Sequence, residues 1–200
     1  YGLPSGGVAA FDGRSGEVKG KVSLPGPVFW EPKVHGDSLI ALCDKWICRM
    51  KLNTESLNSK KSSLAIIRSW FFAGSQIDCN HQWKHELPGK AEADLLLDGD
   101  RVFATCRGKV ASKVCAVSAV TGKGLWTYKT ESEIQSALSI CKDAVFVATQ
   151  KGYLYSIEKK TGKLQWKKRK DDWIPSSITV KDGTAYYGTY QNRYEAMRLP

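Results

Sequence analysis

The sequence predicts an all-β protein, a β-propeller or part of one, with about four four-stranded blades. The phrase TGKGLW at 121–126 returns as TGKLQW at 161–166, and the flanking segments GDRVFATCRGK and KDAVFVATQKG also align. Self-similarity at a period of roughly 20–50 residues is typical of repeat architectures. Each copy contains short alternating apolar runs separated by Gly, Asp, Asn or Lys, and none of the long segments has a helical period.

Three complete repeat units can be placed along the chain, at 28–86, 91–130 and 134–168, with half-units at both ends. In the third unit we expect strands at 134–140, 144–149, 153–158 and 164–167, joined by tight turns that Gly and Asp favour. The half-units could merge into a fourth blade, while an arc, a fragment and a ring completed by another chain stay open. We interpret 1–200 as a single propeller or propeller fragment.

A tryptophan recurs at one slot of the repeat. Gly122 and Gly162 each precede a Trp by four residues, and a Gly in this turn lets the chain reverse without a Cβ clash. The large ring that follows can cover the gap between neighbouring blades. We therefore expect Trp83, Trp126 and Trp166 on equivalent outer strands.

One copy carries an insertion near 56–78, where SLNSKKSSLAIIRSWFFAGSQ begins polar and basic and then turns apolar. Trp70, Phe71 and Phe72 could together present an apolar surface that isolated soluble proteins rarely leave exposed. These three residues are therefore candidates for binding a partner. The alternative is an extra strand or short helix that packs on its own blade.

The segments VCAVSAVTGKGLW and LYSIEKKTGKLQW resemble the tryptophan-docking repeat of the pyrroloquinoline-quinone (PQQ) type propellers. That family includes quinoprotein alcohol dehydrogenases and the periplasmic lipoprotein of outer-membrane β-barrel assembly. The stretch SGEVKGKVSLPGPVFWEPKVHGDSLIALCDKWICRMKL is also similar to the C-terminal propeller of the β-alanine-activating enzyme family. The resemblance implies a propeller fold over nearly the whole chain, but no single function, because function depends on sites added to a fold.

The resemblance to the dehydrogenases implies a test for catalysis. In those enzymes PQQ lies between a Trp and a disulfide of adjacent cysteines, with a bound Ca²⁺ and an Asp as base. This sequence has no adjacent cysteines, and it has no Ser/His/Asp set, phosphate loop or carboxylate pair. We therefore predict no catalytic residue and no cofactor, and a PQQ-dependent dehydrogenase-like fragment is the alternative.

A metal site could be sought at Cys79, His81 and His85. Residues two apart on an extended strand are about 6.6 Å apart, and residues four apart about 13 Å. Zinc ligands lie about 2.0–2.3 Å from the ion, so these three side chains cannot share one without a sharp bend. We predict no metal.

Four cysteines repeat in pairs. Cys43 and Cys106 end the second strand of their units, while Cys48 and Cys115 stand near the start of the third. A cross-strand disulfide is sterically conceivable, but Cys is often a small buried hydrophobe in a strand, and we expect free thiols. With no Asn-x-Ser/Thr sequon in the chain, these features favour an intracellular or organellar compartment over secretion.

The net charge is +10, and basic residues concentrate near the end of the third unit. The candidate basic surface consists of Lys159, Lys160, Lys163, Lys167, Lys168, Arg169 and Lys170. It could attract nucleic acid or an acidic protein, so an RNA- or ribonucleoprotein-associated module is a second alternative. Turns and outer strands carry solvated charge in any case, and no apolar run is long enough for a membrane span. The favoured hypothesis is a non-catalytic scaffold for protein–protein interaction, a subunit of a larger assembly.

Overall fold

The computed structural model describes residues 2–3, 6–11, 13–16, 18–51, 80–134, 136–170 and 172–199. Within these ranges the chain forms strands, turns and bends without a helix, so none of the described elements is a candidate membrane-spanning helix. The chain divides into two compact units, Tyr1–Lys84 and His85–Pro200. The prediction of an all-β protein is confirmed.

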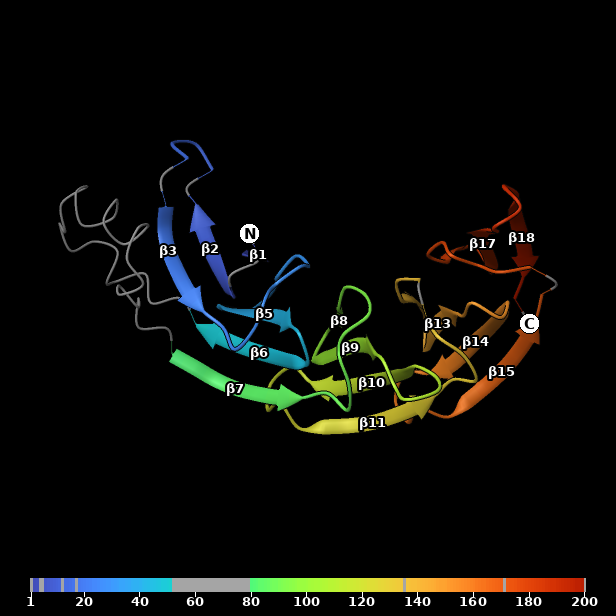
Figure 1. Ribbon diagram of the computed structural model, residues 1–200, viewed down its shortest axis with the longest axis horizontal. Coiled ribbons are helices and arrows are strands. Elements are labelled where there is room, and N and C mark those ends of the chain that lie inside the picture. The colour runs from blue at the N-terminus through green and yellow to red at the C-terminus, as the bar shows by residue number, and fades with distance from the viewer. Residues whose placement is uncertain are drawn as a thin grey trace. The chain divides into compact units, whose positions relative to one another are not determined.

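The first unit contains two antiparallel sheets (Figure 1). One sheet has three strands in chain order: β1 (Gly2–Leu3), β2 (Gly7–Phe11) and β3 (Val18–Ser23). The other has four: β4 (Lys33–His35), β5 (Ser38–Cys43), β6 (Trp46–Lys51) and β7 (Asn80–Glu86), which runs across the boundary between the units. Val8 and Val22 of the first sheet pack with Ala41 and Met50 of the second, so the two sheets share one core.

The second unit contains three antiparallel sheets (Figure 1). The first comprises β8 (Leu96–Asp98), β9 (Arg101–Cys106), β10 (Lys113–Ser118) and β11 (Gly124–Lys129). The second comprises β12 (Ser139–Cys141), β13 (Ala144–Ala148), β14 (Tyr153–Glu158) and β15 (Leu164–Arg169). The third comprises β16 (Thr179–Lys181), β17 (Thr184–Gly188) and β18 (Tyr194–Arg198). Within each sheet the hydrogen-bonded neighbours are consecutive strands, which is the construction of a propeller blade.

The structure refines two details of the predicted repeat. The half-units at the two ends each form a three-stranded sheet within their own unit. The strand expected over 134–140 begins only at Ser139. At its predicted start the Ile134 N–H donates to the side-chain Oγ of Ser112 at 2.9 Å and not to a strand partner.

Packing between sheets explains the burial pattern in the second unit. Every residue of β13 is buried, whereas β15 is mostly exposed. The middle strands are covered on both faces: Val145 packs towards Phe103 of the preceding sheet, and Phe146 packs towards Tyr187 of the following one. Strands covered on both faces read as continuous apolar runs, while outer strands tolerate Lys and Arg.

The repeated Thr-Gly step builds the turn before each outer strand. Gly122 and Gly162 have φ values of +72° and +73°, a region that favours glycine. Their N–H groups donate to the carbonyl oxygens of Ser118 and Glu158, both at 2.9 Å. The Thr161 hydroxyl accepts from the Lys163 N–H at 3.2 Å, which holds the turn from its other side. The two copies of the phrase therefore encode the same turn.

The recurring tryptophans lie on the outer strands, as predicted. Trp83 is in β7, Trp126 in β11 and Trp166 in β15, the fourth strand of each sheet. Trp126 also reaches the next blade, because its Nε1 donates to the Lys159 carbonyl oxygen at 3.1 Å. The indole lies directly over Gly162 of that blade. The tryptophan slot is therefore a docking contact between blades.

The cysteine pairs lie diagonally across the middle hairpins of two blades. The Sγ atoms of Cys43 and Cys48 are 3.8 Å apart, and those of Cys106 and Cys115 are also 3.8 Å apart. All four are buried free thiols. The pKa of Cys106 is raised, first by its hydrogen bond with Cys115 and then by burial, so this thiol stays protonated at neutral pH.

We expect thiol titration of the purified chain, in denaturant and without reductant, to recover Cys43, Cys48, Cys106 and Cys115 as reactive thiols. Blocking exposed thiols before denaturation should leave these four unmodified, because the folded blades bury them. Peptide mapping of the labelled chain assigns each site. Recovery of fewer than these four thiols would show that a hairpin is cross-linked.

Candidate functional site

The predicted partner-binding residues Trp70, Phe71 and Phe72 lie outside the described residues. The strands that flank the insertion are described, and β6 and β7 are hydrogen-bonded neighbours in one sheet. The insertion therefore joins the third and fourth strands of a blade. The role of the three aromatic residues stays a prediction.

The predicted basic surface is largely engaged in contacts within the second unit. Lys159 forms an ion pair with Asp98 at 2.7 Å, and only 19% of its side chain is exposed. Lys167 pairs with Glu131, which raises the pKa of this lysine chiefly through their hydrogen bond.

Three further basic side chains lie against aromatic rings. Lys168 and Arg169 each lie 5.7 Å from a ring centroid, that of Trp166 and that of Tyr153 respectively. Lys170 lies 5.8 Å from the centroid of the Tyr187 ring and also contacts Glu195 at 3.5 Å. Lys160 and Lys163 are exposed in the turn before β15. These contacts divide the basic residues among several local environments, and they do not support a continuous nucleic-acid-binding stripe.

The histidines of the considered metal cluster lie on one extended strand. His81 and His85 are both in β7, while Cys79 is outside the described residues. His85 Nδ1 is 2.9 Å from the Gly122 carbonyl oxygen, so this ring contributes to packing between repeats. Over the described part of the chain, no group of three or more His, Cys, Asp or Glu residues could hold a metal ion.

The three sheets of the second unit share one backbone hydrogen bond at the end of their second strand. In each blade the residue just beyond the second strand donates its backbone N–H to a carbonyl oxygen in the segment before the first strand. We call this repeated contact the rim frame. The donor–acceptor pairs are Arg107–Lys90 at 2.7 Å, Gln150–Glu133 at 2.9 Å and Tyr190–Trp173 at 2.9 Å. One backbone arrangement thus carries different side chains in each blade.

A glycine allows the first rim frame to close. A Cβ on Gly89 would lie 1.8 Å from the Arg107 carbonyl oxygen, which is far inside van der Waals contact. The backbone pairing continues through the Glu92 N–H, which donates to the Thr105 carbonyl oxygen at 3.1 Å. The segment around Lys90 is therefore held tightly against the end of β9.

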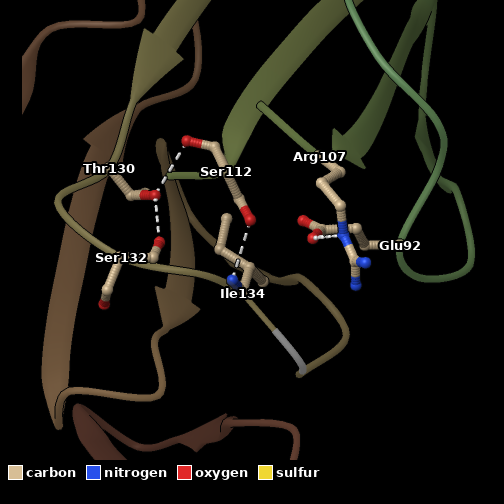
Figure 2. A network of polar contacts seen from close by, with 6 residues as sticks. All are labelled: Glu92, Arg107, Ser112, Thr130, Ser132 and Ile134. Atoms are coloured by element: carbon tan, nitrogen blue, oxygen red, sulfur yellow. Dashed lines mark hydrogen bonds and ion pairs between the residues drawn. The ribbon is translucent and has the colours of Figure 1, made fainter. Parts of the chain in front are cut away.

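The first rim frame borders a cavity of about 510 Å³. Its lining residues are Lys90, Ala91, Glu92, Arg107 and Ile134. Figure 2 shows the Glu92 carboxylate and the Arg107 guanidinium side by side, with Ile134 opposite them. Arg107 Nε donates to Glu92 Oε1 at 3.2 Å. The Glu92 side chain is only 4% exposed, whereas that of Arg107 is 63% exposed.

A buried network positions Ile134 at the cavity (Figure 2). Thr130 Oγ1 lies 2.8 Å from the Ser112 carbonyl oxygen and 2.7 Å from that of Ser132, and its single O–H is shared between these two acceptors. Ser112 Oγ then accepts the Ile134 N–H. Because Ser112 and Thr130 are both buried, these bonds tie the connection between two blades to the loop after β9.

The cavity combines charged and apolar groups that could contact a ligand. It offers a guanidinium, an ammonium, one buried carboxylate and an apolar wall. The chain contains no adjacent cysteines, so the residues present do not fit the PQQ site that the dehydrogenase resemblance implies. Sequence reasoning missed Glu92 and Arg107. One sequence signal could have pointed to Arg107: the aligned position of the next repeat holds Gln150. A residue that differs between repeats at the same position is not required to build the repeat, so it is free to serve binding.

Comparisons with known structures support the fold. The crystal structure of BamB from Moraxella catarrhalis is similar, with a TM-score of 0.70 and 14% identity over 99% of this chain and 54% of that one. The chain thus spans about half the length of that BamB. The crystal structure of the computationally designed Ika4 protein is also similar, with a TM-score of 0.60 and 11% identity over 96% of both chains. No curated protein matches the sequence.

The repeats themselves match a protein family. The family described as outer membrane protein assembly factor BamB, a PQQ-type repeat family, matches residues 77–145 and 139–198. Together these matches cover more than half of the chain and include the second and third complete repeats. The chain therefore belongs to this PQQ-repeat β-propeller family.

Proposed function

We propose that the chain is a non-catalytic β-propeller scaffold that binds a protein partner within a larger assembly. The observation that carries this proposal is the rim frame, in which one rigid backbone contact recurs in three blades while its side chains change. A fold that holds variable side chains on an invariant frame is suited to recognition. The family match, described by the name of an assembly factor, supports the same conclusion.

The chemistry of the described surface also favours a protein partner. The three rim frames present a Lys–Arg pair, a Glu–Gln pair and the stacked rings of Trp173 and Tyr190, whose centroids are 4.9 Å apart. Aromatic and Arg side chains are enriched at protein interfaces. The buried thiol pairs support the further proposal that the chain resides in a reducing intracellular or organellar compartment.

Affinity purification of the tagged chain from its source organism tests the scaffold proposal. We expect a partner of defined stoichiometry in native mass spectrometry, and no bound quinone in the same spectra. An absorbance titration with PQQ and Ca²⁺ tests the dehydrogenase alternative directly. Stoichiometric quinone binding with turnover of an alcohol would contradict the proposal.

A further inference from the structure

The Arg107 guanidinium is held at one nitrogen and exposed at the others. Its Nε is held by the buried Glu92 carboxylate, and the structure describes no other contact of its side chain. The two Nη groups therefore remain available on the exposed edge of the guanidinium. A guanidinium presents such paired donors in a plane that matches the two oxygens of a carboxylate.

Glu92 adds a second requirement for the ligand. Its Oε2 atom is buried and has no hydrogen-bond partner among the described residues. A buried acceptor is unfavourable until an N–H or O–H reaches it. A ligand that fits this cavity therefore brings a hydrogen-bond donor for Glu92 beside an acidic group for Arg107.

Comparison of the rim frames separates recognition from folding. The same backbone contact forms with Gln150 in the next blade and with Tyr190 in the one after it. The frame therefore does not depend on an arginine at this position. Lys90 provides a second cation on the wall, and the net charge of +10 favours an acidic partner.

We infer that this cavity binds an acidic side chain, Asp or Glu, of a partner peptide. The side-chain carboxylate pairs with the Nη groups of Arg107, and a backbone N–H of the same peptide donates to Glu92 Oε2. Ile134 covers the apolar part of the bound residue. This inference rests on the proposed scaffold function, because it specifies the chemistry of the protein partner.

NMR titration of the ¹⁵N-labelled chain with the capped peptide Ac-Ala-Ala-Glu-Ala-Ala-NH₂ tests the inference. The capped ends ensure that the only carboxylate is the side chain. We expect saturable shifts at Lys90, Glu92, Arg107 and Ile134, with a Kd on the order of 1 mM. The matched Gln peptide should bind about tenfold more weakly, because it cannot form the charge-assisted pair.

Two variants and one control assign the effect to the cavity. Arg107→Lys keeps the charge but removes the forked donors. Arg107→Gln with Glu92→Gln removes the pair together, leaving no buried charge unpartnered. Both should weaken binding of the Glu peptide by about tenfold. Lys151→Gln removes an exposed charge that does not line the cavity, and it should leave the Kd unchanged.

Several results would overturn the inference. One is a set of chemical shift changes that do not saturate, or that map to residues outside the cavity. Others are equal Kd values for the Glu and Gln peptides, and a loss of affinity in Lys151→Gln as large as in the cavity variants. Inorganic phosphate competing as well as the peptide would also overturn it, since a general anion site needs no N–H donor. A chain that captures a partner but not this peptide would refute the carboxylate site alone. A chain that binds the peptide but captures no partner would refute the scaffold.

Discussion

Replacing Gly162 with Ala should destabilise the second unit by about 3 kcal/mol. A Cβ at this position would lie 2.6 Å from Trp126 Cδ2 and 2.7 Å from Cγ, so the indole must move. Movement also breaks the hydrogen bond from Trp126 Nε1 to the Lys159 carbonyl oxygen. Urea denaturation followed by circular dichroism measures the loss.

Gly183→Ala is the matched control for this substitution. Gly183 has φ +71°, close to the +73° of Gly162, but nothing lies within 4 Å of its added Cβ. It should therefore lose only about 1 kcal/mol, the cost of a left-handed conformation for alanine.

A double-mutant cycle then isolates the contact. In a Trp126→Leu background, Gly162→Ala should be markedly less destabilising, because the clashing indole is absent. Equal effects of Gly162→Ala and Gly183→Ala would show that Trp126 does not press on the turn, and the docking contact would be wrong.

Deleting residues 58–76 should abolish partner binding, raising the Kd by about 100-fold or more, while the fold persists. Trp70, Phe71 and Phe72 are the aromatic residues expected to anchor the partner. Residues 52–57 and 77–79 still connect β6 to β7, and a hairpin needs only about two to five residues. The circular dichroism spectrum and the melting temperature should therefore change little.

Two further variants separate the aromatic side chains from the length of the segment. A Gly/Ser segment of equal length in place of 58–76 should lose partner binding as the deletion does. The triple substitution Trp70→Ala, Phe71→Ala and Phe72→Ala should do the same with the rest of the segment intact. Unfolding of the deletion variant would instead assign the insertion to the core, and the rim frames would become the principal binding surface.

The repeat itself was predictable because its signals are local. The alternation of apolar residues and the Thr-Gly turn each depend on residues close together in the chain. The positions of Trp126 and Trp166 on outer strands follow from their place four residues after the glycine of the turn. The error at 134–140 has a tertiary cause. Its apolar pattern is real, since Ile134 and Leu138 are buried, but the Ile134 N–H donates to Ser112 Oγ of the neighbouring blade and not to a strand.

By itself, the sequence determined the all-β repeat architecture, the position of the recurring tryptophan and the pairing of the cysteines. Each of these depends on residues that lie within a single repeat. Only the tertiary structure decided that Lys159 and Lys167 are ion-paired, and that each end half-unit forms a three-stranded sheet. It alone brought Glu92 and Arg107 together with Ile134 around one cavity. The physical reason is that these contacts join segments that no local period relates, so their distances depend on how the blades pack.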